Sequence, residues 1–350
     1  MNVPVNGWLF FMLSLISFGL CYLFVPLCKY LSRRLGLLDV PGGHKAHQAA
    51  TPLLGGLAVF AAVWLTLALT AYRGIIPWSL ELQGIFLGSS LIFIMGLVDD
   101  FKEISPAPKF IVQTGAALVV VIHGVSIDLF LGENIITYLL TIIWIVGITN
   151  SFNMLDNMDG LTSGVAAICA LIFSIIAFRQ QDGHTAVMTS VLVGSLVAFL
   201  RFNFDPSELF LGDAGSGFIG FFLGALAVSA HYLQHSRLQH LPIITPILIF
   251  SVPIFDTASV MVIRILEGRP VWDADNRHFS HRLVELGLSR RAAVLVIYLV
   301  AFTVGILAVF LTRVNLADAL LLLLHGAAIF AIIVLLEYSS QLPNNEPDEI

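Results

Sequence analysis

The feature that most constrains this chain is a series of eleven apolar stretches, each of about 17 to 25 residues. They lie at about 7–28, 53–72, 82–98, 108–124, 134–150, 160–178, 184–202, 211–231, 242–266, 292–312 and 317–337. Such continuous runs fit membrane helices and not barrel strands. Only 11% of the residues are charged, which excludes an ordinary soluble domain. We therefore expect an all-α, polytopic membrane protein with about eleven transmembrane helices.

The distribution of Lys and Arg predicts the orientation. None precedes Trp8, whereas Lys29, Arg33 and Arg34 follow the first apolar stretch. The positive-inside rule therefore places the N-terminus outside and, after eleven crossings, the C-terminus in the cytoplasm. Thirteen of the 17 Lys and Arg residues then fall inside, and the four outside are Arg73, Arg179, Arg237 and Arg313. The missing basic start also argues against a cleavable signal peptide.

We expect one transmembrane catalytic domain at 1–338, with its active-site loops on the cytoplasmic face. The polar, acidic end at 339–350 is expected to be a disordered cytoplasmic tail. The cysteines lie in or at the end of apolar stretches without metal-ligand spacing, and we interpret them as small hydrophobic residues: Cys21, Cys28 and Cys169.

The unusual polar residues gather in five predicted cytoplasmic stretches, at 39–56, 98–103, 149–161, 202–217 and 272–287. This one-sided distribution favours a site that meets cytoplasmic reagents at one membrane face. An ion-coupled transporter, the non-enzyme alternative, would more often carry its ionisable residues near the midplane.

Two acidic motifs follow apolar stretches. In VDDFKE, Asp99 and Asp100 need a compensating cation, for which a divalent metal, a metal-bound substrate or Lys102 is available; the alternative is a solvated helix end. The weak likeness of DDxxE to prenyl-diphosphate sites leaves an intramembrane prenyltransferase as another reading, and Glu103 has no assigned role.

The motif NMLDNMDG places Asn153, Asp156 and Asp159 at steps of three, so that they can face one cavity and supply the oxygen ligands that Mg²⁺ prefers. In FLGDAGSG, Asp213 lies among glycines at an expected helix start, where a bridging metal would reconcile it with a phosphate. Phe210 is either an interfacial anchor or an aromatic on which a base stacks.

Two basic stretches complete the set. RHFSHRL places His278, His281 and Arg282 on one helix face, suited to phosphate oxygens, unless it is only a positive-inside loop. Lys45 precedes TPLLGG, where a Gly-rich helix entry permits close approach of a phosphate; a plain positive-inside loop is the alternative.

Taken together and in this order, VDD, NMLDNMDGL, FNFDPSELFLGDAGS and HFSHRL resemble the polyprenyl-phosphate N-acetylhexosamine-1-phosphate transferase family over about residues 30–290. The resemblance implies a bacterial multi-pass enzyme of the cytoplasmic membrane that uses Mg²⁺ or Mn²⁺. It would move a sugar 1-phosphate from a UDP-sugar to undecaprenyl phosphate and release UMP. Its partners would be these substrates and membrane lipid, with no nucleic acid; homodimerisation is left open.

The resemblance also implies roles for individual residues. The catalytic set is Asp99, Asp100, Asp156 and His281, with the paired aspartates handling the lipid phosphate. The metal ligands are Asp213 and Asp156. The substrate-binding set is Lys45, Asn153, Asp159, Asn203, Phe210, His278 and Arg282, of which Asn203 and Phe210 would contact uracil and Arg282 the pyrophosphate.

The chain departs from the family's patterns at two positions. DNMDG has Asn157 where Gly is usual, and HFSHR has Ser280 where the middle His is usual, which shifts the expected role to His281 and Arg282. The Arg after the last His resembles the GlcNAc-1-phosphate branch, which initiates cell-envelope glycans such as O-antigen. The phospho-MurNAc-pentapeptide transferase branch ranks second, because it usually has three His and no following Arg.

A prenyltransferase would leave HFSHR and FLGDAGS without a role, and DGLTSG does not match the DGxxAR signature of CDP-alcohol phosphotransferases. The sugar, the glycan pathway, the polyprenyl length and the choice between single and double displacement stay open.

Overall fold

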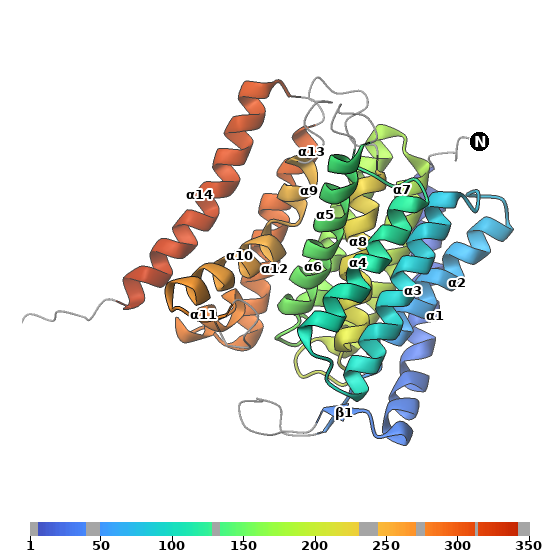
Figure 1. Ribbon diagram of the computed structural model, residues 1–350, viewed down its shortest axis with the longest axis horizontal. Coiled ribbons are helices and arrows are strands. Elements are labelled where there is room, and N and C mark those ends of the chain that lie inside the picture. Colours follow the sequence, from blue (N-terminus) through green and yellow to red (C-terminus); the bar gives the residue numbers. More distant parts are fainter. Residues whose placement is uncertain are drawn as a thin grey trace, which may run out of the picture.

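We describe a computed structural model of the chain, which covers residues 6–39, 50–127, 134–230, 244–270, 277–311 and 314–341. The structure is a nearly all-α bundle (Figure 1). Its first eight helices are α1 (Gly7–Leu35), α2 (Gly55–Tyr72), α3 (Leu80–Phe101), α4 (Pro106–Ile122), α5 (Ile135–Leu155), α6 (Leu161–Gln180), α7 (Gly183–Asn203) and α8 (Gly212–Ser229). The others are α9 (Ile244–Ile249), α10 (Ser251–Leu266), α11 (Phe279–Glu285), α12 (Arg290–Gly305), α13 (Leu307–Leu311) and α14 (Leu316–Gln341).

The described residues contain nine helical segments that are long and apolar enough to cross a membrane, with Arg290–Leu311 counted as one. These nine correspond to nine of the eleven expected stretches. The remaining two differ: 108–124 forms the 17-residue helix α4, and 242–266 is divided into the short helices α9 and α10. A multi-pass all-α membrane protein is therefore confirmed in its coarse form.

The division between α9 and α10 has a local cause. Pro253 has no N–H to donate to the carbonyl of Ile249, four residues earlier. The Sγ of Cys169 on α6 donates to that carbonyl at 3.2 Å instead. Cys169 is thus more than the small hydrophobic residue that the sequence suggested, because it satisfies a backbone oxygen inside an apolar bundle.

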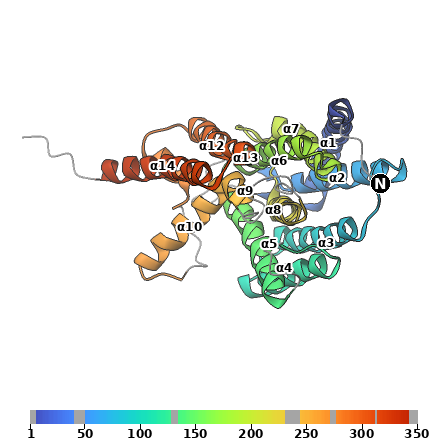
Figure 2. The same ribbon diagram turned by 90° about the horizontal axis from the view of Figure 1, so that it is seen from above.

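Helix α8 lies in the middle of the bundle and packs against α2, α3, α5 and α6 (Figure 2). Close approach depends on glycine. A Cβ on Gly96 of α3 would lie 2.5 Å from the Cα of Ala214, and one on Gly56 of α2 would lie 2.4 Å from the Cα of Gly215. Any larger residue would separate these backbones, so the glycines bring the end of α3 directly to the start of α8.

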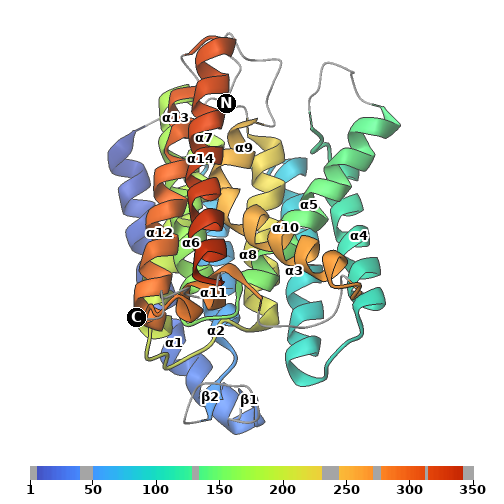
Figure 3. The ribbon, with the colours of Figure 1, turned by 90° about the vertical axis from the view of Figure 1, so that its left-hand side faces the viewer.

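The helix ends that carry the acidic motifs lie together at the lower end of the bundle in Figures 1 and 3. A short antiparallel pair, β1 (Leu38–Asp39) and β2 (Thr51–Pro52), lies there, and α3 and α5 end there while α8 begins. Helix α1 begins at the opposite end from the one where α14 finishes (Figure 3). The outer surface exposes many large apolar side chains, including Leu320, Leu324 and Leu335 of α14, as expected of helices that face lipid.

Candidate active site

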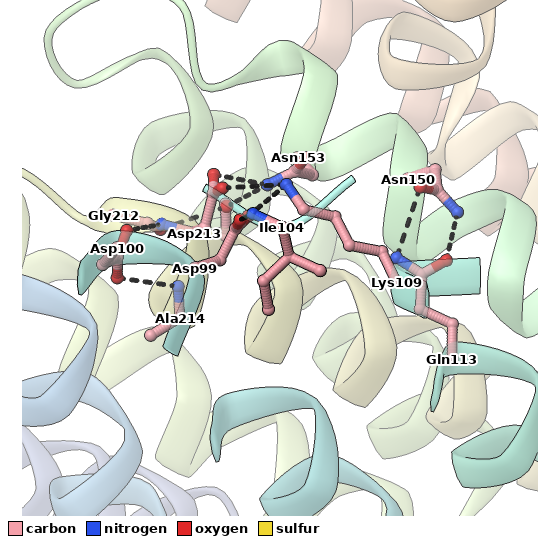
Figure 4. A network of polar contacts seen from close by, with 11 residues as sticks. Asp99, Asp100, Ile104, Lys109, Gln113, Asn150, Asn153, Gly212, Asp213 and Ala214 are labelled. Atoms are coloured by element: carbon pink, nitrogen blue, oxygen red, sulfur yellow. Dashed lines mark hydrogen bonds and ion pairs between the residues drawn. The ribbon is translucent and has the colours of Figure 1, made fainter. Parts of the chain in front are cut away.

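The backbone at the start of α8 is held by Asp100, the second acid of VDDFKE. Its Oδ1 accepts the N–H of Asp213 at 2.7 Å, and its Oδ2 accepts the N–H of Ala214 at 3.2 Å (Figure 4). The unpaired N–H groups at a helix start favour such an anion. Gly212, with φ 73°, makes room, since a Cβ there would lie 2.7 Å from the Asp100 carboxylate. Asp100 therefore fixes where Asp213 sits.

Asp99 is buried and pairs with Lys109 from α4. One oxygen accepts the N–H of Ile104 at 2.7 Å, and the other forms an ion pair with the Lys109 ammonium. The Lys109 Nζ also lies 3.5 Å from Asp213 Oδ2. The sequence left three partners open for the paired acids: a divalent metal, a metal-bound substrate or Lys102. In the structure Lys109 occupies the place beside Asp99, and Lys102 is exposed at the end of α3.

Asp213 lies at the centre of the cluster. The Nδ2 of Asn153 on α5 donates to its Oδ1 at 2.9 Å and also lies 3.0 Å from the Ser216 hydroxyl. The Asp213 side chain is still 41% exposed. It faces an open pocket of about 490 Å³, whose lining residues are Asp99, Glu103, Ile104, Ser105, Pro106, Lys109 and Asp213. A ligand in this pocket would meet the Lys109 ammonium and the carboxylates of Asp213 and Glu103, whereas Asp99 is buried behind Lys109.

A second polar layer lies one helical turn deeper (Figure 4). Gln113 of α4 and Asn150 of α5 exchange two amide hydrogen bonds, of 3.3 and 2.7 Å. Gln113 is four residues beyond Lys109, and Asn150 is three residues before Asn153. The amide pair therefore sets the relative height of α4 and α5, and with it the height of the two groups that meet at Asp213.

The motif between α5 and α6 approaches the same cluster. Asp156 directly follows α5, and burial raises the pKa of its carboxyl to about 8, with the charge of Asp213 adding to the rise. Asp159 turns the other way, and its Oδ2 accepts the N–H of Ser207 at 3.0 Å. Of the two acids in this motif, Asp156 is the one whose pKa responds to the charge of Asp213, whereas Asp159 holds the loop between α7 and α8.

The donor set fits a hard divalent cation in an open site. Carboxylate oxygens of Asp213 and Asp156 are of the kind that Mg²⁺ prefers. Within the described ranges, no group of three or more His, Cys, Asp or Glu side chains is placed to hold a metal ion. Mg²⁺ usually binds one or two carboxylates and completes its shell with water and phosphate oxygens.

Asn203 and Phe210 flank the loop before α8. Asn203 is 4% exposed; its Oδ1 accepts from Ser163 at 2.8 Å and its Nδ2 donates to the carbonyl of Leu209 at 3.0 Å. The backbone of Phe210 bonds to Pro52 and Gly55, at 2.8 and 2.9 Å. Both residues thus build the loop that leads to Asp213, and their proposed contact with uracil stays a prediction.

We expect Asn203→Ala to lower the free energy of unfolding by about 2 kcal/mol, because it removes two buried hydrogen bonds, one from the Ser163 hydroxyl and one to the Leu209 carbonyl. Thermal unfolding in detergent would measure this, with Ser163→Ala as the matched control that removes only one of the two bonds. A variant of unchanged stability with a tenfold higher KM for the sugar donor would instead indicate a direct substrate contact.

The histidine helix α11 is attached to α10 by an acid that the sequence analysis did not single out. Asp256 is fully buried; its Oδ2 lies 2.8 Å from Nδ1 of His278 and its Oδ1 accepts the N–H of Phe279 at 2.6 Å. His281 is half-buried, and burial together with His278 lowers its pKa, so that it is neutral at pH 7. A carboxylate inside the apolar stretch 242–266 was the signal that could have identified Asp256.

Arg282 is also held from the side of α10 and α14. Its Nε lies 3.1 Å from Glu337, one Nη donates to Ser259 at 3.1 Å, and the other donates to the carbonyl of Arg277 at 2.5 Å. The Arg282 side chain is 9% exposed. No described contact joins it to Asp213, so its expected grip on a pyrophosphate stays a prediction. Lys45 lies outside the described residues.

The structure thus connects Asp99, Asp100, Asn153 and Asp213 in one polar cluster with Lys109 as an added cation, and Asp156 lies close enough to interact electrostatically with Asp213. Of these residues, Asp99, Lys109 and Asp213 line the pocket. Asp159, Asn203 and Phe210 support the neighbouring loop. His281 and Arg282 lie on α11, and His278 is the capping residue directly before it. This helix contacts the acidic motif through the hydrogen bond from Ser280 to Asn157.

Comparison with known proteins gives consistent similarities. A family model described as glycosyl transferase family 4 matches residues 82–231. A "probable undecaprenyl-phosphate N-acetylglucosaminyl 1-phosphate transferase" of Bacillus subtilis is 34% identical over 86% of this chain and 84% of its own length. A "decaprenyl-phosphate N-acetylglucosaminephosphotransferase" of Mycolicibacterium smegmatis is 32% identical over 80% of this chain and 76% of its own. An "undecaprenyl-phosphate alpha-N-acetylglucosaminyl 1-phosphate transferase" of Escherichia coli is 26% identical over 85% and 83%.

Proposed function

Because this chain belongs to glycosyl transferase family 4, the polyprenyl-phosphate N-acetylhexosamine-1-phosphate transferases, we propose that it transfers N-acetylglucosamine 1-phosphate from UDP-N-acetylglucosamine to undecaprenyl phosphate. UMP is the other product, and the lipid-linked diphosphate sugar starts a cell-envelope glycan. The names of the relatives support the acceptor and the transferred group. The observation that carries the proposal is Lys109, which lies between Asp99 and Asp213 on the wall of an open pocket at the end of the bundle.

We place the enzyme in the bacterial cytoplasmic membrane with eleven crossings, α4 and the α9–α10 pair included. The N-terminus is outside, the C-terminus inside, and the pocket opens to the cytoplasm. The asymmetry of thirteen inside to four outside Lys and Arg supports this orientation. It also fits the chemistry, because nucleotide sugars are cytoplasmic reagents.

The reaction is a phosphoryl transfer in which an oxygen of the lipid phosphate attacks the β-phosphorus of the donor. A phosphorus–oxygen bond forms to the lipid phosphate, and the bond from the β-phosphorus to the bridging oxygen breaks, so that UMP leaves with that oxygen. A phosphate monoester has a second pKa near about 6, so the acceptor is largely a dianion at neutral pH. A strong base is therefore a minor requirement, and charge repulsion between acceptor and donor is the larger barrier.

The residues of this chain reduce that repulsion and orient the groups. The Lys109 ammonium faces the pocket and offsets the charge of an entering phosphate. Asp99 orients Lys109, and Asp100 orients Asp213 through the backbone of α8. His281, neutral at pH 7, is available as a hydrogen-bond partner. Asn153 donates to Asp213 and fixes the direction of its carboxylate.

Asp213, with Asp156, would hold Mg²⁺ or Mn²⁺. When bound, the cation would neutralise negative charge on the pyrophosphate of the sugar donor. The supporting loop of Asp159, Asn203 and Phe210 lies beside this group and would receive the uridine side of the donor.

The test is a detergent-solubilised assay with undecaprenyl phosphate, Mg²⁺ and a panel of UDP-sugars, in which UMP release is measured. We expect release with UDP-N-acetylglucosamine and its loss on chelation by EDTA. Release only with UDP-MurNAc-pentapeptide would assign the muramyl branch instead. Failure of every UDP-sugar, both as a substrate and as a thermal stabiliser, would overturn the proposal in favour of a prenyltransferase or a transporter.

A further inference from the structure

The histidine helix α11 has firm attachments on one of its sides. Asp256 of α10 holds His278 and the N–H of Phe279, and the Phe279 ring is fully buried against Phe255. Arg282 adds the bonds to Ser259 of α10 and the ion pair with α14. These contacts make α11 a rigid extension of α10, but they do not determine how far it lies from the acidic cluster.

On the other side, α11 meets the acidic motif through two side chains. The hydroxyl of Ser280, which is 1% exposed, donates to Oδ1 of Asn157 at 2.5 Å. The Nδ2 of Asn157 donates at 2.9 Å to the carbonyl of Met154, in the last turn of α5. One amide therefore links the end of α5 to the first turn of α11, and its orientation is determined by both bonds.

The places of these two residues in the sequence matter. Asn157 directly follows Asp156 and precedes Asp159 by two, while Ser280 directly precedes His281. A bond between them fixes the distance between the histidine side and the acidic side of the site. They are also the two positions at which the motifs depart from the patterns that the chain otherwise resembles, and in the structure these two departures contact each other.

We propose that Asn157 and Ser280 form a positioning pair that holds the histidine helix against the Asp156 loop and so sets the catalytic geometry. The inference rests on the proposed function for its kinetic consequence. Neither residue is expected to contact the reacting groups of the substrates. Glycine or alanine at 157 has no acceptor for the hydroxyl, and alanine at 280 has no donor, so either change breaks the link while leaving the charged residues in place.

The kinetic test is a double-mutant cycle of Asn157→Ala and Ser280→Ala, with kcat and KM for both substrates. We expect each single variant to lose about tenfold in kcat, as for one lost hydrogen bond, with KM changed less than about twofold. The double variant should lose no more than either single variant, since both remove the same bond. Ser280→Thr, which keeps the hydroxyl, should recover most of the activity.

A multiplicative loss of about a hundredfold in the double variant would overturn the pairing, because the two residues would then act independently. A rise in KM for one substrate at constant kcat would also overturn it, since that result indicates direct substrate binding. If Ser280→Thr and Ser280→Ala were equally active, the hydroxyl at position 280 would have no role in catalysis.

A second measurement does not depend on turnover. In membranes oxidised with copper phenanthroline, which requires no bulky reagent to enter the contact, the thiols of Asn157→Cys and Ser280→Cys should be oxidised to a disulfide cross-link, whereas Asn157→Cys with Glu285→Cys, on an exposed position of α11, should not be. The three native cysteines are buried, and the wild type serves as the background. If no cross-link formed between positions 157 and 280, the proposed contact would be contradicted. If the wild-type protein released no UMP, the proposed function and the kinetic consequence would both be contradicted. The cross-link would still test the contact between residues 157 and 280.

Discussion

Replacing Asp213 by Asn is expected to lower UMP release from UDP-N-acetylglucosamine by about a thousandfold, the largest loss among the variants considered. The change is nearly isosteric, so Asn153 keeps an acceptor and the backbone bonds to Asp100 remain. The substitution replaces the charged carboxylate, the expected metal ligand, by a neutral amide. It also removes the negative charge that lies 3.5 Å from the Lys109 ammonium. The effect should fall on kcat, since the lost charge acts mainly where negative charge accumulates in the reaction.

Glu208→Gln is the matched control for that variant. Glu208 lies on the loop that leads to α8 and pairs with Lys29, but its side chain is 52% exposed, and exposed pairs contribute little. We expect its activity to stay within about twofold of the wild type. Initial rates at several Mg²⁺ concentrations would compare the two variants. If Asp213→Asn kept full activity, the assignment of Asp213 as a metal ligand would be wrong. If the activity of this variant recovered at high Mg²⁺ concentration, the substitution would have weakened binding of the cation.

The membrane helices were largely predictable because the apolar runs are long and their ends carry polar residues. The prediction was less accurate where a contact between segments decides the structure. In the stretch 242–266, Pro253 is a local signal for a break, but one helix was expected where α9 and α10 occur. That Cys169 would satisfy the carbonyl left free by Pro253 depends on a contact with α6, which the stretch itself does not show.

The acidic motifs were identified from residue types, but their connections were not. Asp99 and Asp100 are adjacent in the sequence, and successive residues on a helix point about 100° apart. They therefore bond in different directions, one to α4 and one to α8. Lys102 was the side-chain cation that sequence proximity offered, beside a divalent metal or a metal-bound substrate, whereas the packing of α3 against α4 places Lys109 next to Asp99.

The same limit applies to Asp256 and to the Asn157–Ser280 pair. The sequence separation of 22 residues between Asp256 and His278, and of 123 between Asn157 and Ser280, carries no pairing information by itself. Each contact depends on how helices pack, and packing follows from features such as the close approach at Gly96, which the sequence alone does not report.

Lys109→Met should be the second most damaging change, with a loss of about a hundredfold in kcat/KM and a clear loss of stability. The methionine preserves the length and apolar stem of the side chain but removes its charge. Asp99, whose side chain is 3% exposed, would then be a buried carboxylate without its ion-pair partner. Removing one member of a buried pair typically lowers the free energy of unfolding by about 3 to 5 kcal/mol. Thermal unfolding and UMP release measured on the same preparation would report both losses.

Lys102→Met is the control that separates the two readings of VDDFKE. Lys102 is exposed and lies seven residues earlier, so we expect its replacement to leave activity within about twofold and stability unchanged. Adding Asp99→Asn to Lys109→Met should restore stability, because the buried charge is then gone, but it should not restore activity, because the pocket still lacks its ammonium. Restored stability without restored activity would show that Lys109 has two roles: it neutralises Asp99, and it binds a phosphate of the substrate. If Lys102→Met were the more damaging change, the cation beside the paired acids would be the one that sequence proximity suggested, and the α3–α4 geometry would be wrong.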